Sequence, residues 1–512
     1  MQTLFDIINA ACGKIQIVSD LFWDFPTNFE WYQKLPILGN FPLAIILLIG
    51  SGIYFTFRLD FVQVRRFGYA ICALKKNKSS DMGISPAAAF FLSTAMRVGP
   101  GNILGVTGAI STGGPGALFW MWVSAFFGMA TAFTESTLAQ IFKEENGNEY
   151  MGGMAFYGRK LMKNSAYVGV LFSLLYIIYA LLCLPAQGFN TVSAVGQIAE
   201  TMTGASISPN SSLYLISFAL LMAVAAFASF GGIRKVTAMT DVLVPIMAVV
   251  YVLTVIVLVM TNISRIPWFF SSVFAGAFSP EAVFGGAFGV ALMQGIKRGL
   301  MSNEAGQGTI TIPAATADAP HPCAQGCIQS VGVFLDTMVI CTLTGFIVVM
   351  GHVWTTPDAA AWFEMGKLQR YVASAAALTP QGAPFTLVSF IVSLCFGLFA
   401  FTCLLGFIAF TEISAKRISI NKKFIASIRF LCLFVIAFGV LTNIAGMDLD
   451  ALWNLSDFAN IIMAYCNIPL LYMGFTHVLT AKRHFDLNDG TKYNSKTAGI
   501  LLPVWDKKTD KE

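Results

Sequence analysis

Charged residues are scarce in this sequence. Only 12% of its 512 residues are Asp, Glu, Lys or Arg, whereas 56% are hydrophobic, and a soluble globular domain carries about 25% charged residues. The mean hydropathy is +0.70. These values exclude a disordered chain, a nucleic-acid-binding protein and an ordinary cytosolic enzyme. The composition predicts an all-α polytopic membrane protein.

Signatures of enzymes, disulfide frameworks and metal sites are also missing. The ten cysteines mostly lie in apolar runs, and we interpret them as core residues. The spacing His321-x-Cys323-xxx-Cys327 lacks a fourth ligand and differs from that of a zinc site. Gly99-x-Gly101 follows no predicted strand and lacks the spacing of a nucleotide loop. Without a nucleophile–His constellation, we expect neither an enzyme nor an organic cofactor.

Long apolar runs are abundant, and about 20 such residues cross a bilayer. Eleven runs qualify, at about 37–57, 86–112, 117–141, 166–196, 213–231, 238–262, 283–300, 326–351, 384–411, 424–444 and 454–480. Residues 1–36 carry apolar positions at helical spacing and then an aromatic cluster, without the features of a signal peptide. They predict an interfacial segment outside the cytoplasm.

Basic residues are distributed unevenly over the predicted loops. Of 32 Lys and Arg, 25 fall on one side of the predicted membrane, including Lys297, Arg298 and the tail at 481–512, and five fall on the other side. The positive-inside rule then predicts a cytoplasmic C-terminus and an outside N-terminus. We expect a multi-pass protein of the plasma membrane, the inner membrane of a bacterium.

Two of the runs are interrupted. The second contains Gly99-Pro100-Gly101 in mid-span, where Pro removes a backbone hydrogen bond and Gly favours unwinding. The seventh is short, rich in Gly between 285 and 299, and ends in charge. The alternative is that these glycines only allow close helix packing, as small-xxx-small pairs do at Gly101 and Gly105 and at Gly285 and Gly289.

The position of the two interruptions suggests an internal repeat. If the helix at 37–57 is peripheral, the interrupted runs become the first members of two groups of five, at 86–262 and 283–480. Interrupted spans at corresponding positions indicate a transporter with inverted repeats. Their half-helix ends offer N–H groups to a substrate carboxylate and C=O groups to a cation.

Few ionisable residues lie inside the predicted spans. Arg97 precedes the first interruption, Glu135 and Asp336 lie on the third and eighth runs, and Glu304 follows the seventh. Such residues are costly in a membrane and usually face a cavity or a partner. They are candidates for gating or ion coupling, and the alternative is a packed ion pair or a helix cap.

Several motifs resemble those of the alanine/glycine:cation symporter family, the sodium:alanine symporters. Residues 113–128 read GGPGALFWMWVSAFFG, which is similar to the family signature, and 101–103 resemble its first broken helix. Residues 298–308, RGLMSNEAGQG, are similar to a second hallmark, which 321–322 and 332–337 continue. The resemblance runs from about 40 to 480. It implies a LeuT-like fold with a 5+5 inverted repeat plus one extra helix, about 11 transmembrane helices in total.

The resemblance also implies a function. Members of this family import small neutral amino acids with Na⁺, or sometimes with H⁺. We therefore expect Na⁺-coupled uptake of alanine or glycine by alternating access, with the lipid bilayer as the surroundings and no obligate protein partner. An ion channel is a remote alternative, because no filter-like segment is repeated along the chain.

Residue roles follow from the match to the family motifs. Gly99, Gly101 and Asn102 fall on the unwound first helix, where substrate and ion are expected. Backbone oxygens of Val98 and Gly99, with the Thr402 hydroxyl, are the implied Na⁺ ligands. The remaining implied substrate-binding residues are Gln187, Asn190, Met293, Gly295, Cys403 and Phe407.

Three of these positions depart from the family pattern. Gln187 lies three residues before Asn190 rather than two, and one residue turns a helical side chain by about 100°. Cys403 replaces a hydroxyl, and a thiol is a poor ligand for a hard cation. Phe407 replaces a Trp expected to wall the pocket, and we hypothesise that the extra room admits a larger neutral amino acid such as glutamine.

Overall fold

The structure is a computed structural model that describes residues 2–35, 39, 41–75, 82–208, 211–278, 287–356, 359–380, 382–446, 449–487 and 491–511. The first residues of the predicted runs at 37 and 283, and with them Gly285, lie outside the described residues.

The described chain is almost entirely helical, because a bilayer offers no hydrogen-bond partners to backbone groups that a helix leaves open. The elements up to residue 161 are α1 (Gln2–Asp24), α2 (Glu30–Gln33), α3 (Leu43–Arg58), α4 (Val62–Arg65), α5 (Phe67–Lys75), α6 (Pro86–Arg97), η2 (Gly101–Gly105), α7 (Val106–Gly113), α8 (Gly116–Ile141), β1 (Glu144–Asn146), β2 (Glu149–Met151) and α9 (Met154–Leu161). Strands β1 and β2 form an antiparallel hairpin.

The second part of the chain contains the longest helices. Its elements are α10 (Ala166–Thr203), α11 (Ser212–Thr261), η3 (Ile263–Arg265), α12 (Ile266–Phe278), α14 (Ala287–Asn303), α15 (Thr311–Thr316), α16 (Pro322–Val333), η4 (Phe334–Cys341), α17 (Thr342–Gly351), η5 (Val353–Thr355), α18 (Ala359–Glu364), α19 (Lys367–Ala376), α20 (Ala383–Ile418), α21 (Lys422–Ile444), α22 (Leu449–Leu487), α23 (Ser495–Ala498) and α24 (Pro503–Lys511).

Seven helices of the described residues are long and apolar enough to cross a membrane. They are Gly116–Ile141, Ala166–Thr203, Ser212–Thr261, Pro322–Gly351, Pro384–Ile418, Lys422–Ile444 and Leu452–Leu487. The third of them combines two predicted runs and is kinked at Gly232, whose φ of 71° leaves the helical region. Helix α3 is a shorter apolar helix.

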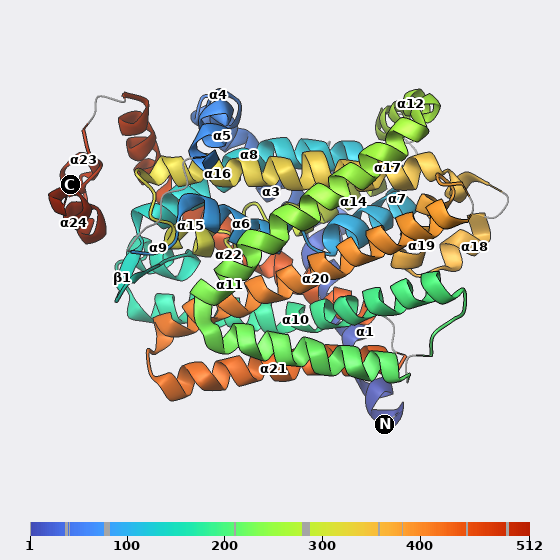
Figure 1. Cartoon of the computed structure of the whole chain (residues 1–512). Helices are drawn as coiled ribbons and strands as arrows, with labels where there is room; N and C mark the ends of the chain where they lie inside the picture. Colours follow the sequence, from blue (N-terminus) through green and yellow to red (C-terminus); the bar gives the residue numbers. More distant parts are fainter. Residues whose placement is uncertain are drawn as a thin grey trace.

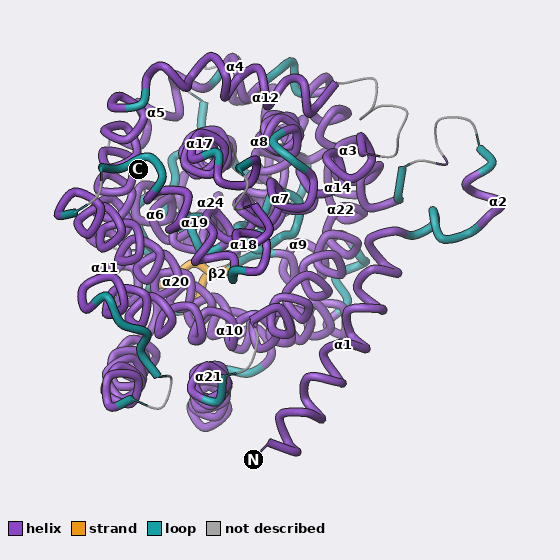
Figure 2. The backbone as a smooth tube through the Cα atoms, turned by 90° about the vertical axis from the view of Figure 1, so that its right-hand side faces the viewer, coloured by secondary structure: helices purple, strands orange, loops and turns teal. Residues whose placement is uncertain are grey.

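The long helices lie side by side in a bundle. Figure 1 shows α10, α20 and α21 running along the molecule, with α8, α16 and α17 at the opposite side and α11 crossing between them. Figure 2 looks along the bundle and shows α7, α8 and α17 towards its middle, with α3, α10 and α11 around them and α21 outside. Of the interrupted spans, the part formed by α7 thus lies towards the middle of the bundle.

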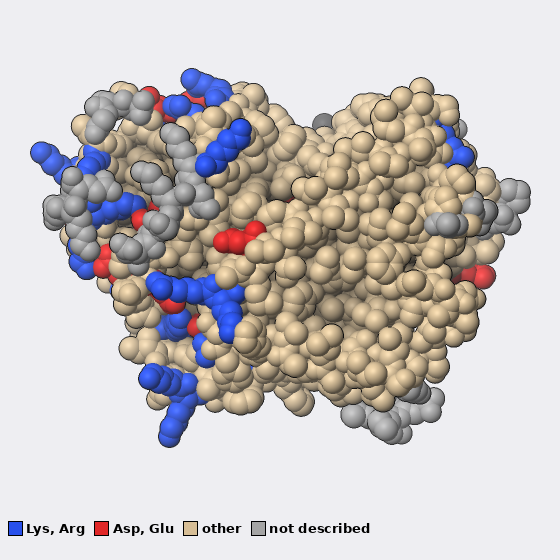
Figure 3. All heavy atoms as spheres, viewed as in Figure 1, with Lys and Arg blue, Asp and Glu red and all other residues tan. Residues whose placement is uncertain are grey.

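Charge gathers at one end of the bundle. Figure 3 shows Lys and Arg side chains concentrated at the end where Figure 1 places α9, the β1–β2 hairpin, α23 and α24, next to a broad band without charge. We call this the charged end. Ion pairs there include Arg159–Glu144, Lys507–Glu145 and Lys508–Asp318. An uncharged band of this kind suits a bilayer interior.

Lys297 and Arg298 do not lie at the end of their helix next to the membrane surface, where the predicted run at 283–300 placed them. Helix α14 continues past both residues to Asn303, and both pair with Asp457 of α22, at 3.0 Å each. The reason is charge compensation, since a buried carboxylate neutralises side chains that would otherwise end a membrane segment. The prediction counted these two residues among the 25 Lys and Arg on one side of the membrane, and they therefore have to be removed from that number.

The two interruptions are real, but the second lies further along the chain than predicted. The first separates α6 from η2 at Val98–Pro100. The second spans 304–310, between α14 and α15. Gly295 stays helical because it packs against α8, where an added Cβ would lie 2.4 Å from the Ala117 carbonyl oxygen. The break instead uses Gly306 and Gly308, whose φ values of 87° and 82° favour glycine.

Candidate functional site

Two π-helical segments meet at the centre of the molecule. Asn102 lies on η2 and Asp336 on η4, and both side chains are fully buried. The Asn102 Nδ2 donates to Asp336 Oδ1 at 2.6 Å, and its Oδ1 accepts a hydrogen bond from the Gly99 backbone N–H at 2.9 Å. π-helical turns are rare and frequently mark functional sites. This contact joins the first interruption to the helix that follows the second.

Hydroxyl groups complete the surroundings of Asp336. Its Oδ2 accepts hydrogen bonds from the Ser302 hydroxyl at 2.8 Å and the Thr337 hydroxyl at 2.7 Å. Ser302 belongs to the last turn of α14, immediately before the second interruption. We call Asn102, Ser302, Asp336 and Thr337 the Asp336 cluster. It gathers a carboxylate, two hydroxyls and an amide where three segments converge, and oxygen groups of this type are those that hard cations prefer.

Arg97 connects the end of α6 to the second interruption. Its Nε donates to the Asn303 carbonyl oxygen at 3.1 Å, and its Nη1 donates to Gln329 Oε1 of α16, also at 3.1 Å. Gly332 leaves room for it, because a Cβ there would lie 1.9 Å from Nη1. The guanidinium is 1% exposed. Its hydrogen bonds favour a structural tie between α6, α14 and α16.

Glu135 holds the second interruption in its unwound form. Its carboxylate accepts hydrogen bonds from the backbone N–H groups of Gly306 and Gly308, at 3.0 Å each, and from Asn467 Nδ2 at 2.9 Å. Successive N–H groups in such a conformation form an anion-binding concavity, which this side chain fills. Glu304 lies within the same interruption and accepts a hydrogen bond from the Thr309 hydroxyl at 2.8 Å.

The buried charges around these interruptions do not balance. Arg97 interacts electrostatically with three carboxylates, those of Glu135, Glu304 and Asp336. With all four groups ionised, this set carries two more negative than positive charges. Because buried charge is costly unless it is compensated, the arrangement favours uptake of a cation or a proton.

A cavity of about 720 Å³ lies beside the predicted substrate residues of α10. It is lined among others by Leu104 of η2, Asn190 of α10, Phe396 of α20 and Lys367 of α19. Asn190 is 1% exposed, and neither atom of its amide has a hydrogen-bond partner among the described residues. Gln187, one turn earlier, also has an unpartnered amide oxygen. Polar atoms left open in this way are available to a polar ligand.

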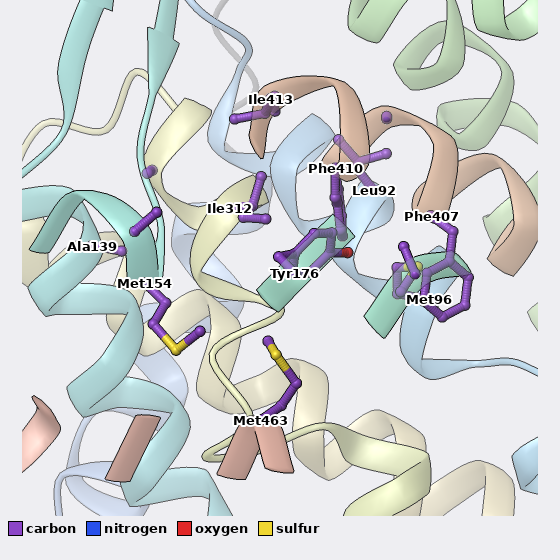
Figure 4. Close-up of a cluster of buried hydrophobic side chains, with 14 of the residues drawn as sticks. Leu92, Met96, Ala139, Met154, Tyr176, Ile312, Phe407, Phe410, Ile413 and Met463 are labelled. Carbon is purple, nitrogen blue, oxygen red and sulfur yellow. The ribbon is translucent and has the colours of Figure 1, made fainter. Parts of the chain in front are cut away.

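Cys403 and Phe407 of α20 approach the first interruption from the side. The Cys403 Sγ lies 3.6 Å from the Met96 carbonyl oxygen. Figure 4 shows the Phe407 ring next to Met96, and its centroid lies 5.6 Å from that of Tyr179. Both residues are buried. Cys403 thus lies beside Gly99 and Phe407 beside Met96, and their contact with the substrate stays a prediction.

The Thr402 hydroxyl has partners on its own helix and on α11. Its hydroxyl donates to the Leu398 carbonyl oxygen of its own helix at 3.0 Å and lies 3.6 Å from Met247 Sδ of α11. No hydrogen bond within the described part of the chain joins it to Val98 or Gly99. Val98 and Gly99 lie at the first interruption, and the Na⁺ site predicted for them and Thr402 stays a prediction.

Met293 and Gly295 are not brought to the Asp336 cluster. Met293 packs with Ile45 and Trp120 in a separate apolar cluster, and Gly295 contacts Ala117 of α8. Ser302 lies nine residues beyond Met293, about 13 Å along a helix. Gly295 therefore allows close helix packing, which was the alternative explanation for the glycines of this run. For Gly101, a Cβ would lie 3.8 Å from the Met301 carbonyl oxygen, an ordinary contact.

Ser302, Thr337 and Asn467 were not predicted to take part. Ser302 and Thr337 belong to the motifs at 298–308 and 332–337, so their location was available but their role was not. Neutral hydroxyl and amide groups are common in apolar helices. Only the contact with a carboxylate distinguishes these three residues, and that contact requires the folded chain.

Comparisons with known proteins identify similar sequences and a similar fold. A family model described as the sodium:alanine symporter family matches residues 30–498. The chain is 34% identical to a probable sodium/glutamine symporter, GlnT, of Bacillus subtilis (strain 168), over 86% of this chain and 87% of that protein. It is 33% identical to the sodium/alanine symporter AgcS of Methanococcus maripaludis, over 89% of this chain and 96% of that protein.

A third relative and one solved structure are also similar. The amino-acid carrier protein AlsT of Bacillus subtilis (strain 168) is 36% identical over 87% of this chain and 88% of that protein. The crystal structure of MhsT in complex with L-phenylalanine covers 84% of this chain and 95% of that chain, with a TM-score of 0.53 and 13% identity. The structural likeness shows a shared transporter fold.

Proposed function

Because the chain belongs to the sodium:alanine symporter family, we propose that it is a secondary active transporter that takes up a small neutral amino acid, such as alanine or glycine, together with Na⁺ by alternating access. The observation that carries this proposal is the Asp336 cluster. It places a buried carboxylate between two interrupted helices, and a symporter must bind its coupling ion where movement of those helices can release it.

The coupling ion binds at Asp336 in this proposal. The Asp336 carboxylate supplies the charge, and the hydroxyl oxygens of Ser302 and Thr337 lie within hydrogen-bond distance of it. The Asn102 amide oxygen lies on the other side of its amide, where it accepts the Gly99 N–H. Such ligands suit Na⁺, and protonation of the same carboxylate is the alternative that would make the protein H⁺-coupled. The excess of buried negative charge supports both versions.

The amino acid binds next to the ion, at the first interruption. Its carboxylate faces the beginning of η2, where Gly101 adds no side chain and the helix dipole favours a negative group. It enters through the cavity beside Asn190, whose free amide offers both a donor and an acceptor. Cys403 and Phe407 then limit the length of its side chain.

The same proposal includes the topology. We infer eleven membrane-spanning segments: α3, followed by two groups of five related by an inverted repeat, with α6–α7 and α14–α15 as the broken first members. The N-terminal segment lies outside and the charged end lies in the cytoplasm. The concentration of Lys and Arg at the charged end supports this orientation.

A larger neutral amino acid such as glutamine is the second candidate substrate. Phe407 stands where the family pattern has a Trp, and a smaller ring leaves a larger pocket. The relative named a probable sodium/glutamine symporter matches over most of both chains. Competition with labelled alanine separates the two, because alanine and glycine outcompete every larger amino acid if the pocket is small.

The deciding experiment is uptake into proteoliposomes of several amino acids, each measured with a Na⁺ gradient, a Li⁺ gradient or a proton gradient. We expect saturable uptake that requires one of these gradients and is abolished by Asn102→Ala. Unsaturable flux without a gradient would instead indicate a channel. Normal uptake by Asn102→Ala would contradict the assignment of the site.

A further inference from the structure

At the charged end of the bundle, backbone hydrogen bonds join the segment before α6 to the segment after α15. Ile84, two residues before α6, donates its backbone N–H to the Thr316 carbonyl oxygen at 3.1 Å, and accepts the Asp318 N–H at 2.8 Å. These bonds form a short parallel bridge between the start of α6 and the end of α15. Alternating access in a transporter with inverted repeats moves one group of helices against another around the site, and this bridge joins the broken helices of the two groups at the charged end.

Helix α8 reinforces the same segment. The Gln140 side chain donates to the carbonyl oxygens of Ala314 and Ala317, and Lys143 Nζ donates to Ala317 at 3.0 Å. Both side chains are buried. The residues that follow α15 are therefore held by α6 on one side and by α8 on the other.

The C-terminal tail, residues 491–511, lies over this junction. Trp505 is 2% exposed and donates from Nε1 to the Gln140 carbonyl oxygen at 3.0 Å. Lys508 pairs with the Asp318 carboxylate and donates to the Ala319 carbonyl oxygen at 2.6 Å. The tail thus contacts α8 and the residues directly after α15 at the same time.

Lys143 binds the tail through its ammonium group. The Nζ lies 4.8 Å from the Trp505 ring centroid and 4.0 Å from that of Tyr150 in β2. An ammonium between two aromatic faces is attracted by both rings. Lys507 adds an ion pair with Glu145 of β1 at 2.7 Å. The tail is consequently bound both to the β1–β2 hairpin and to the end of α8, next to the bridge.

The tail also has hydrogen bonds of its own. Within it, Ser495 donates to the Asp506 carboxylate from both its backbone N–H, at 2.8 Å, and its hydroxyl, at 2.5 Å, and the Leu502 N–H donates to the Ser495 hydroxyl at 2.6 Å. These internal bonds connect α23 to α24 without help from the membrane helices. Release of the tail would expose Tyr493 and Leu502 as well as Trp505, because all three are buried in the same hydrophobic cluster.

We propose that Trp505 and Lys508 are gate-positioning residues. The docked tail holds the start of α6 and the end of α15 together, and it must leave before the transporter opens to the cytoplasm. This rests on the proposed function and adds a requirement to it. A tail that stays in place keeps the bridge between Ile84 and Thr316–Asp318 covered, and each transport cycle then includes its release.

The first test locks the tail in place. The double variant Lys508→Cys with Asp318→Cys is treated with a short bis-methanethiosulfonate crosslinker in proteoliposomes, and uptake is measured before and after reduction with dithiothreitol. We expect at least a tenfold loss of uptake that reduction restores. Each single-cysteine variant, treated identically, is the matched control and should transport at its untreated rate, because the native cysteines are retained in all three proteins.

The second test removes one contact of the tail. Trp505→Ala should raise the maximal uptake rate severalfold with little change in the half-saturating substrate concentration, because release no longer limits opening. Leu501→Ala is the control, since that side chain is 80% exposed, and its rate should equal that of the unaltered protein. A merely structural Trp505 would instead give an unchanged or lower rate.

The outcomes separate this inference from the proposed function. Full uptake by the crosslinked double variant would overturn the inference while leaving the transport activity intact. Failure of the two cysteines to crosslink would show that the tail is not seated on Asp318 and would overturn it as well. Absence of amino-acid uptake by the unaltered protein under every gradient would contradict the proposed function itself.

Discussion

At the scale of single residues, the contact between Asn102 and Asp336 has the greatest consequences. It pairs an amide and a carboxylate that are 234 residues apart and fully buried. The sequence indicated both residues, Asn102 from its place after an interruption and Asp336 from its rarity as a charged group in a span. It did not indicate that they touch, because nothing local relates the two segments.

Asp336→Asn is the substitution that isolates the charge of this cluster. The variant keeps the size and most hydrogen bonds of the side chain, but it removes the negative charge that we propose holds the coupling ion. Breaking a buried charge pair costs about 3 kcal/mol or more, which corresponds to about 100-fold in affinity. We expect the cation concentration for half-maximal uptake to rise by that factor, measured in proteoliposomes.

Asp241→Asn provides the matched control for that measurement. Asp241 lies on α11 and is exposed, so its change should leave the cation dependence as it is. Unaltered cation dependence of Asp336→Asn would contradict the assignment of the coupling ion to this cluster.

His321 gives a second prediction at this scale. Its Nδ1 accepts the Cys323 N–H at 3.0 Å, which leaves its Nε2 to donate to His484 Nδ1 at 3.2 Å. Burial, with a smaller effect of His484, lowers the pKa of His321 to about 3 from 6.5. The unfolded chain therefore binds a proton below about pH 6.5 that the folded chain does not, and stability falls with decreasing pH by up to about 1.4 kcal/mol per pH unit.

The measurement is the melting temperature in detergent between pH 7.5 and pH 5, for the unaltered protein and for His321→Asn. The Asn oxygen can still accept the Cys323 N–H as an N-cap, but it does not titrate in this range. We expect the variant to lose fewer degrees on acidification. Parallel curves for the two proteins would show that His321 does not carry the pH dependence.

At the scale of elements, the sequence predicted interruptions correctly and located one of them incorrectly. Gly-Pro-Gly at 99–101 breaks a helix wherever it occurs in a span, since the proline effect is local. The glycines of α14 gave a false position because glycine serves two purposes, close packing and unusual backbone conformations. Gly295 serves the first and Gly308 the second, and only the neighbouring helix decides which.

Gly308→Ala tests the unwound segment. An alanine at a φ of 82° is strained by about 1–2 kcal/mol. Its Cβ would also lie 3.0 Å from the side chain of Asn467, which donates a hydrogen bond to the Glu135 carboxylate. We expect a lower melting temperature and at least a tenfold loss of uptake, because Glu135 and Asn467 hold the segment that adjoins Ser302.

Gly289→Ala is the control on the same broken helix. Gly289 is helical, and among the described residues nothing lies within 4 Å of its added Cβ, so alanine should leave uptake unchanged and stabilise the helix by about 0.5–1 kcal/mol. Equal effects of the two substitutions would mean that the backbone conformation of Gly308 is unimportant.

At the scale of the whole molecule, composition alone predicted a helical membrane bundle, and the concentration of Lys and Arg at one end agrees with the loop pattern. The pattern erred for Lys297 and Arg298, which pair with Asp457 inside the bundle. Counting charges along a sequence assumes that each one reaches water. Such a count cannot include the partner of Arg298, because Asp457 lies 159 residues further along the chain.

The orientation can be checked with an impermeant maleimide applied to cells. Leu501→Cys, in the tail, should be labelled only after permeabilisation, because we place the charged end in the cytoplasm. Trp31→Cys, 63% exposed near the N-terminus, should be labelled in intact cells. The unaltered protein supplies the background from native cysteines such as Cys72, and labelling of Leu501→Cys in intact cells would reverse the topology.

The pairing of Lys297 and Arg298 with Asp457 also bears on how the protein is made. A Lys or Arg at the centre of an isolated transmembrane helix costs about 2.5–3.5 kcal/mol on insertion, so α14 carries two such penalties when it leaves the ribosome. Their compensation arrives only with α22, after the three intervening long helical segments have been synthesised. The seventh segment therefore cannot settle in the bilayer on its own, and its integration has to wait for, or be completed by, the last one.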